Sequence, residues 1–318
     1  MADEFKIRKC ATMEVFNRDA ERHPSYRRAQ AAIENNITAL LSNYKSFRIT
    51  KPQPIQVVVH VIYQTDEQNI TEEQVTSQLE VLNKDFRAQN ADKGKVPEVW
   101  TSLVADTFIE FVMATVSPDG TATNGITRTK TDVASFGTDN SVKYSSEGGK
   151  SPWPTDRYLN IWVCSLGNSI LGYAQFPGGP AETDGVVIDY HAFGTMGTAT
   201  APFNLGRTAT HEIGHYLNLS HIFGDGRTAN CDDTDYVDDT PNQLGPNYQK
   251  PVFPTISCNN APNGDMFVNY MDYVDDDTMC MFTEGQAARM NATLSGPRAT
   301  LINPSKANND DISRTSVS

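Results

Sequence analysis

The spacing of apolar residues along the chain predicts a central region built from strands and helices. Four mostly apolar runs have the length of buried strands. They lie at residues 55–63, 109–116, 158–164 and 185–190. Between the first two runs, apolar residues from Val75 to Phe86 recur at helical spacing after a capping pattern that begins at Thr71. A second helix of this region is predicted to start near Leu205.

Both ends of the chain differ from this region. Residues 1–50 are polar, and residues 18–43 predict one or two solvent-exposed helices. Two prolines within residues 51–54 then interrupt the helical pattern, as expected at a boundary. The last third is rich in Asp, Asn, Pro and Gly and predicts one helix, at residues 283–294. Residues 303–318 are polar and predict a mobile tail.

Composition indicates a soluble globular protein and excludes some classes of partner. The 318 residues are 38% hydrophobic and 20% charged, and no apolar run has the length of a membrane span. The net charge of −13 argues against binding to nucleic acid or to anionic membrane surfaces.

The negative charge is concentrated in one segment. From Asp225 to Asp277 there are eleven aspartates and only two basic residues, Arg227 and Lys250. A solvated acidic face is the simplest interpretation of such a segment. Because it is predicted to be rich in loops, calcium coordination and attraction of a cationic substrate are alternatives.

A short histidine motif carries the chemistry. His211 and His215 are four residues apart, so on a helix they lie on one face and can bind a single ion, with Glu212 beside them. This HExxH pattern is typical of zinc-dependent peptide hydrolysis. A surface helix with incidental histidines is the alternative.

His221 strengthens the metal hypothesis. Six residues after His215, it would point away from the ion if the helix continued, so it can be a third ligand only if the chain turns back. Asn218 is placed for that turn, because Asn tolerates the left-handed backbone conformation well. Three neutral imidazoles would leave one position of a tetrahedral zinc ion open to water.

Together with a second motif, these residues identify a family resemblance. The run Asn269-Tyr270-Met271-Asp272-Tyr273 resembles the methionine-containing turn of metzincin metalloproteases, whose motif is HExxHxxGxxH. Asn218 stands where that motif has Gly. The surroundings resemble the pappalysin family, close to ulilysin-like enzymes, over roughly residues 50–300. The resemblance implies an α/β metzincin fold, with a twisted, mostly parallel five-stranded sheet, a backing helix, an active-site helix and an irregular C-terminal lobe.

The resemblance also implies a division of the chain. Residues 1–47, called the leader from here on, would be a propeptide. Residues 48–221 would form an N-terminal catalytic subdomain that ends with the zinc motif. Residues 222–302 would form a C-terminal subdomain with a calcium loop and the methionine turn, followed by the tail.

Roles for individual residues follow from the same resemblance. Glu212 would act as the general base, and Tyr273 would stabilise the oxyanion. Met271 would form an apolar floor beneath the histidines, although ordinary core packing fills that role equally well. Asp277 would lie at the base of the pocket for the residue after the scissile bond and favour Arg or Lys there. A loop carboxylate without this role is the alternative for Asp277.

Further implied features concern cations and cysteines. Asp235, Asp238 and Thr240 match a calcium loop, although turn chemistry alone also favours Asp and Thr there. Cys231 and Cys258 match a disulfide of the family. Of the other three cysteines, Cys164 lies in a strand-like run and is most simply buried, the pairing of Cys280 stays open, and Cys10 would be a latent fourth zinc ligand that silences the enzyme.

The sequence therefore predicts a secreted, monomeric zinc endopeptidase, with calcium as a second cofactor, made as a zymogen. No secretory signal is visible, and a trimmed N-terminus is the preferred explanation, with an unusual export route or a cytoplasmic enzyme as alternatives. Cleavage by the enzyme itself is expected before Arg48 or, less favourably, before Lys51, because Pro52 stiffens the second position. The alternatives are a zinc endopeptidase with an apolar preference and an inactive metal-binding module.

Overall fold

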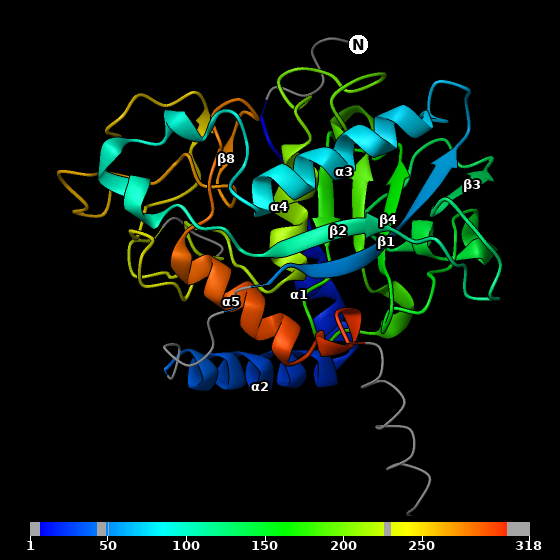
Figure 1. The fold of residues 1–318 in the computed structure, drawn as a ribbon, viewed down its shortest axis with the longest axis horizontal. Helices are drawn as coiled ribbons and strands as arrows, with labels where there is room; N and C mark the ends of the chain where they lie inside the picture. The colour runs from blue at the N-terminus through cyan, green and yellow to red at the C-terminus, as the bar shows by residue number, and fades with distance from the viewer. Residues whose placement is uncertain (1–6, 43–48, 50, 226–229, 304–318) are drawn as a thin grey trace, which may run out of the picture.

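The computed structural model describes residues 7–42, 49, 51–225 and 230–303, and all structural statements concern these residues. A six-stranded sheet forms the centre (Figure 1). Its strands are β1 (Gln53–Tyr63), β2 (Ile109–Met113), β3 (Ile126–Lys130), β4 (Leu159–Cys164), β5 (Gly172–Ala174) and β6 (Val186–Asp189). The expected cleavage site at Arg48 lies outside the described residues, as does nearly all of the predicted tail.

The topology confirms a mostly parallel sheet. The strand order is β2-β1-β4-β6-β5, and β3 pairs with the second half of β1, beyond the part that pairs with β2. Every pairing is parallel except that of β5 with β6. The apolar pattern predicted four of these strands and missed β3 and β5. Strand β3 is polar and largely exposed, and β5 has three residues, so neither carries a strand pattern of its own.

The two faces of the sheet bury different helices. One face packs with α3 (Glu72–Phe86) and α4 (Arg207–Tyr216) in a core that includes Val57, Val59, Leu82 and Ile213. The side chains that alternate with these, such as Trp162 of β4, point to the opposite face. There they pack with Ala11 and Val15 near the start of α1 (Thr12–Arg22). The leader therefore belongs to the hydrophobic core of the second face.

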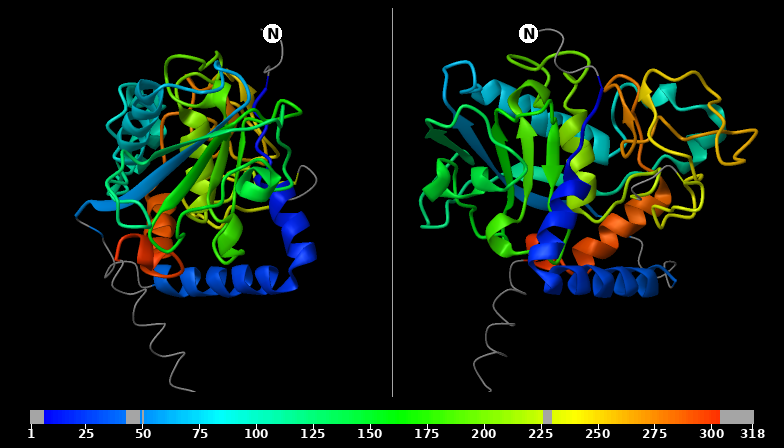
Figure 2. Two further views of the ribbon diagram at one scale, coloured as in Figure 1. Left: turned by 90° about the vertical axis from the view of Figure 1, so that its right-hand side faces the viewer. Right: turned by 180° about the vertical axis from the view of Figure 1, so that it is seen from behind.

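The leader forms two helices that pack against the rest of the chain. Helix α1 starts six residues before the predicted helical region, and α2 (Pro24–Leu41) follows after a one-residue link. Figures 1 and 2 show α2 lying alongside α5 (Glu284–Ser295), a helix from the opposite end of the chain. The hydroxyl of Tyr26 donates to the carbonyl of Phe176 at 2.9 Å, which ties α2 to the segment after β5.

The chain after α4 is irregular, as predicted. It contains two-residue strands β7 (Tyr248–Gln249) and β8 (Tyr273–Val274), then α5. A capping box at Thr283 and Gln286 starts α5, and Asp239 accepts a hydrogen bond from the Thr283 hydroxyl. The predicted disulfide between Cys231 and Cys258 is present, and the thiols of Cys10, Cys164 and Cys280 are free.

A buried histidine in the central strand predicts how stability depends on pH. The ring of His60 bonds Thr127 on β3 at 2.7 Å and Asn160 on β4 at 3.0 Å. Burial lowers the pKa of His60 to about 4. The unfolded chain takes up this proton near pH 6.5, so stability is present above that pH and is lost as the pH falls toward 4.

We expect this one group to remove about 2 kcal/mol of unfolding free energy between pH 7 and pH 5. Urea unfolding of the protein at both pH values, beside a His60→Gln variant, measures the contribution as the difference between their pH dependences. Identical pH dependences in the two proteins would contradict it.

Candidate active site

Helix α4 presents its two histidines from a fully buried position. Every residue of α4 is buried, and the helix ends at Tyr216, one residue after His215. The Nε2 atoms of His211 and His215 are 3.2 Å apart, and those of His215 and His221 are 3.0 Å apart. The three imidazoles therefore converge on one point, as ligands of a single ion must.

The opposite nitrogen of each ring is already bonded. Nδ1 of His211 bonds the carbonyl of Tyr270, Nδ1 of His215 bonds that of Leu219, and Nδ1 of His221 bonds the Asp225 carboxylate, each at 2.7 Å. These partners fix the ring orientations and leave Nε2 free for a metal. Burial lowers the pKa of His215 to about 3 and that of His211 as well, so both rings are neutral, as metal ligands must be.

The turn back to His221 uses the residue expected for it. Asn218 has a φ of 72°, in the left-handed region. Below the turn, the fully buried Met271 packs against Gly214. A Cβ at position 214 would lie 2.5 Å from the Met271 sulfur. Only glycine at this position therefore lets Met271 approach α4 this closely.

Cys10 completes the histidine cluster. Its sulfur and one ring nitrogen of each histidine all lie within 4.8 Å of one another. Burial and the nearby Glu212 carboxylate raise the pKa of the Cys10 thiol. Three imidazoles and a thiol form a donor set that suits zinc, and a bound cation would stabilise the thiolate.

Two leader side chains also engage Glu212. The hydroxyl of Thr12 donates to Oε2 of Glu212 at 2.8 Å, and the Cys10 thiol lies 3.5 Å from the same oxygen. Burial raises the pKa of Glu212 to about 7, although these two hydrogen bonds act in the opposite direction. The leader backbone pairs in parallel with β5, where the amide of Ala11 donates to the carbonyl of Gly172 at 3.0 Å.

Three consecutive aspartates, Asp275 to Asp277, follow β8, and the second and third have different surroundings. Asp276 is buried and forms an ion pair with Arg8 of the leader at 2.6 Å. It also accepts hydrogen bonds from the backbone amides of Leu205 and Arg207 at the start of α4. Asp277, in contrast, is 41% exposed and pairs with Lys250 at 2.5 Å. Asp276 rather than Asp277 therefore contacts the leader residue that lies two positions before Cys10.

Arg8 is held on every side. It donates to the hydroxyl of Thr208 at 3.0 Å and to the carbonyl of Val274 at 3.2 Å, and its guanidinium lies 4.9 Å from the centre of the Phe203 ring. The surrounding residues thus hold this basic side chain through an ion pair, hydrogen bonds and an aromatic ring.

Tyr273 lies beside the three histidines. Its ring centre is 5.0 Å from that of His221 and 5.7 Å from that of His211. Its hydroxyl is 3.4 Å from the backbone carbonyl oxygen of Cys10. The phenol hydroxyl therefore points toward the backbone carbonyl that the leader places beside the histidines.

The predicted calcium residues form a tight turn. Both carboxylate oxygens of the buried Asp235 accept from the Thr240 hydroxyl, at 2.9 and 2.8 Å, and one also accepts from the amide of Val237. Asp238 is exposed. Burial raises the pKa of Asp235 to about 7.

Sequence reasoning missed several contributors to the site. The carbonyls that bond the histidines carry no sequence signal, because any residue supplies one. Thr12 and Arg8 flank Cys10 in a polar leader and carry no signal of their own. Asp225 had a signal, since it lies four residues after His221 and follows it in the acidic segment.

Comparisons with known proteins agree with this geometry. The peptidase family described as Pregnancy-associated plasma protein-A matches residues 143–295. An extracellular metalloprotease of Pyricularia oryzae is 32% identical over 239 residues, which cover 67% of this chain and 82% of that protein. One of Verticillium alfalfae is 33% identical and covers 72% of this chain and 70% of that protein.

Solved structures give the same result. Mature mirolysin of Tannerella forsythia in complex with a cleaved peptide is 46% identical, with a TM-score of 0.79, and covers 81% of this chain and 98% of that chain. A promirolysin mutant of the same organism is 42% identical, with a TM-score of 0.81, and covers 94% of this chain and 99% of that chain. With these similarities and its three converging histidines, this chain belongs to the pappalysin family of metalloproteases and has the metzincin fold of mirolysin.

Proposed function

We propose that the chain is the zymogen of a zinc endopeptidase, silenced by its own leader. The leader carries this proposal, because it places Cys10 beside the three histidines and bonds Thr12 to Glu212. The promirolysin similarity, which covers more of the chain than that of mature mirolysin, supports it. The extracellular relatives and the disulfide support secretion. Among the described residues, the helices include none with the length and apolar character of a membrane span.

His211, His215 and His221 would hold the zinc ion, which would supply a polarised water and a Lewis acid for the scissile carbonyl. Once Thr12 and Cys10 leave, the Oε2 atom of Glu212 is free to take a proton from water and to deliver it to the leaving amine. Tyr273 would donate a hydrogen bond to the oxygen of the scissile carbonyl as its negative charge develops.

The substrate preference follows from Arg8. Its side chain fills the Asp276 pocket while Cys10 lies at the metal position, two residues away. We propose that Asp276 receives an Arg or Lys side chain that follows the scissile bond, and that Arg8 occupies this pocket until the leader is removed. This assignment replaces Asp277 by its neighbour.

Cleavage of a random peptide library by the processed enzyme tests both the activity and the preference. We expect new N-termini dominated by Arg and Lys, and a preference for Arg over Leu that falls by about 100-fold in Asp276→Asn, because a charged hydrogen-bonded pair is lost. The ratio of Arg to Leu products is measured within one preparation, so it does not depend on the folded fraction. Asp277→Asn should keep the preference. New N-termini dominated by Leu or Phe would contradict the assignment.

Calcium binding at Asp235 and Thr240 is a further part of the proposal, with Asp238 as the source of a third oxygen. A buried carboxylate with a raised pKa, in a turn rich in oxygen atoms, suits a hard cation. Excess calcium, added after treatment with a calcium-selective chelator, is expected to raise the thermal midpoint by roughly 5 °C. The rise should be lost in Asp235→Asn and kept in the matched surface variant Asp232→Asn. An unchanged midpoint in the wild-type protein would reject the site.

A further inference from the structure

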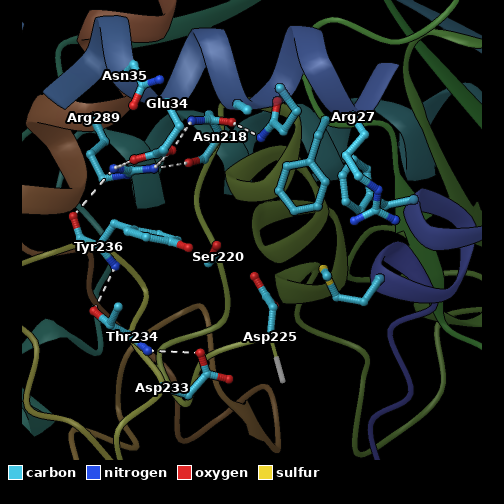
Figure 3. A pocket seen from close by; sticks show the side chains of 15 residues that line it. Arg27, Glu34, Asn35, Asn218, Ser220, Asp225, Asp233, Thr234, Tyr236 and Arg289 are labelled. Carbon is cyan, nitrogen blue, oxygen red and sulfur yellow. Dashed lines mark hydrogen bonds and ion pairs between the residues drawn. The ribbon is translucent and has the colours of Figure 1, made fainter. Parts of the chain in front are cut away.

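The leader has a second anchor, away from Cys10, between Glu34 on α2 and Arg289 on α5. The Nη1 and Nη2 atoms of Arg289 donate to the two oxygens of Glu34 at 2.8 and 2.7 Å, so the pair is bidentate. The side-chain amide of Asn218 lies 3.4 Å from the same carboxylate, and Gln30 donates to the Asn218 side-chain oxygen at 2.7 Å. Figure 3 shows Glu34 between Arg289 and Asn218.

Arg289 belongs to the part of the chain that remains after the leader is removed. It is 2% exposed, and its other hydrogen bonds are to the backbone carbonyls of Asn218 at 3.3 Å and Tyr236 at 3.4 Å. Its Nε has no hydrogen-bond partner among the described residues. The carboxylate of Asp235 is also close enough to interact with this charge, but it is turned toward Thr240 and is the proposed calcium ligand. Loss of Glu34 would leave a buried guanidinium short of an anion, which is costly.

A cavity of about 380 Å³ lies between this guanidinium and two residues that contact the histidines, Phe176 and Asp225. Arg289 and Asn218 line one end of it. Phe176, which also lines it, packs against the ring of His215 with the ring centres 5.5 Å apart. Met13 and Phe16 of α1 contribute to its wall and would leave with the leader. Removal of the leader would therefore uncover the residues that lie between Arg289 and Phe176, beside His215.

The path of the leader shows which side of the scissile bond this cavity serves. Arg8 occupies the pocket proposed for the residue after the scissile bond, and Cys10 lies at the metal. Asp276 accepts hydrogen bonds from backbone amides at the start of α4, whereas Met13 and Phe16 line the cavity beside Phe176, which packs on His215 near the end of α4. The cavity therefore lies beyond the histidines as seen from Asp276 and would receive residues that precede the scissile bond. This step depends on the proposed function.

We infer that Arg289, together with Asn218, is a specificity-determining subsite for an acidic side chain that precedes the scissile bond. Glu34 of the leader occupies this subsite in the zymogen, as Arg8 occupies the basic-residue pocket. Asp225 and Asp233 line the cavity away from Arg289 (Figure 3), so the attraction for a carboxylate is confined to the Arg289 end. Glutamate matches the length of the side chain that the leader supplies.

Peptide cleavage by the processed, zinc- and calcium-loaded enzyme tests the subsite. Each peptide carries Arg after the scissile bond and either Glu or Gln at one of the positions two to five residues before it. At one position, the Glu peptide is expected to have a kcat/KM about tenfold above that of its Gln partner. This Glu-to-Gln ratio should fall to about one in Arg289→Gln and stay intermediate in Arg289→Lys, which keeps the charge without the bidentate fork.

The ratio is measured within each enzyme preparation, so partial misfolding of a variant does not change it. The exposed Arg157, changed to Gln, provides a control with the same loss of charge and should keep the wild-type ratio. A wild-type ratio of one at every position, or a preference that survives in Arg289→Gln, would overturn the inference. If no peptide of either kind were cleaved, the proposed function would fail, and the inference with it.

Discussion

Replacement of Glu212 by Gln is expected to lower kcat for peptide cleavage by about 10³-fold or more, with bound zinc unchanged. The amide keeps the size of the side chain and can still bond Thr12, but it cannot take a proton from water. Hydrogen bonds to Tyr270, Leu219 and Asp225 fix the three imidazoles, and Glu212 takes no part in these bonds. The affinity for zinc should therefore survive the substitution.

The measurement pairs steady-state kinetics on one Arg-containing peptide with the zinc content of the same samples. A matched His215→Gln variant should lose both zinc and activity, which separates loss of the base from loss of the metal. Wild-type activity in Glu212→Gln would contradict the role of Glu212, and loss of zinc in that variant would show a structural effect instead.

The second large effect concerns release of the leader. Full-length protein with Arg8→Ala and Cys10→Ala together is expected to lose its leader at least about 100-fold faster than wild type, because it loses a buried ion pair and the metal-directed thiol. Each single variant should be intermediate, since the other anchor remains. The time course of leader loss on a gel, at one protein concentration, gives the rates.

Lys9 supplies the control, because its side chain is exposed and, among the described residues, donates a hydrogen bond only to the carbonyl of Asn168. Lys9→Ala should process at the wild-type rate. If it accelerated processing as strongly as the double variant, general loosening of the leader would explain the effect better than the two anchors. An unchanged rate in the double variant would reject the anchors.

The sequence predicted those parts of the molecule that depend on local pattern. The apolar periodicity of α3 and the β-branched run of β1 placed both elements to within two residues, because each buries one continuous face or strand. Strand β3, with the sequence Ile-Thr-Arg-Thr-Lys, is held by pairing with β1 rather than by its own burial. Such tertiary pairing leaves no signal in a short polar segment.

The same distinction holds in the site. The spacing of His211, His215 and His221 predicts a shared ion once the chain turns back after the helix, so the pattern itself indicates the geometry. Asp276 and Asp277 are chemically identical neighbours, and the backbone after β8 decides which one faces the cleft. Only the fold brings Arg8 to Asp276, across 268 positions of sequence.

The most direct test of the account is incubation of the full-length protein with zinc and calcium, beside its Glu212→Gln variant. The N-terminus and the activity of each sample are followed over time. We expect a new N-terminus at Arg48 or Lys51 in the wild-type protein only, with activity rising as the leader disappears. Equal cleavage of the Glu212→Gln sample, or full activity before any cleavage, would contradict a zinc endopeptidase that is silenced by its own leader.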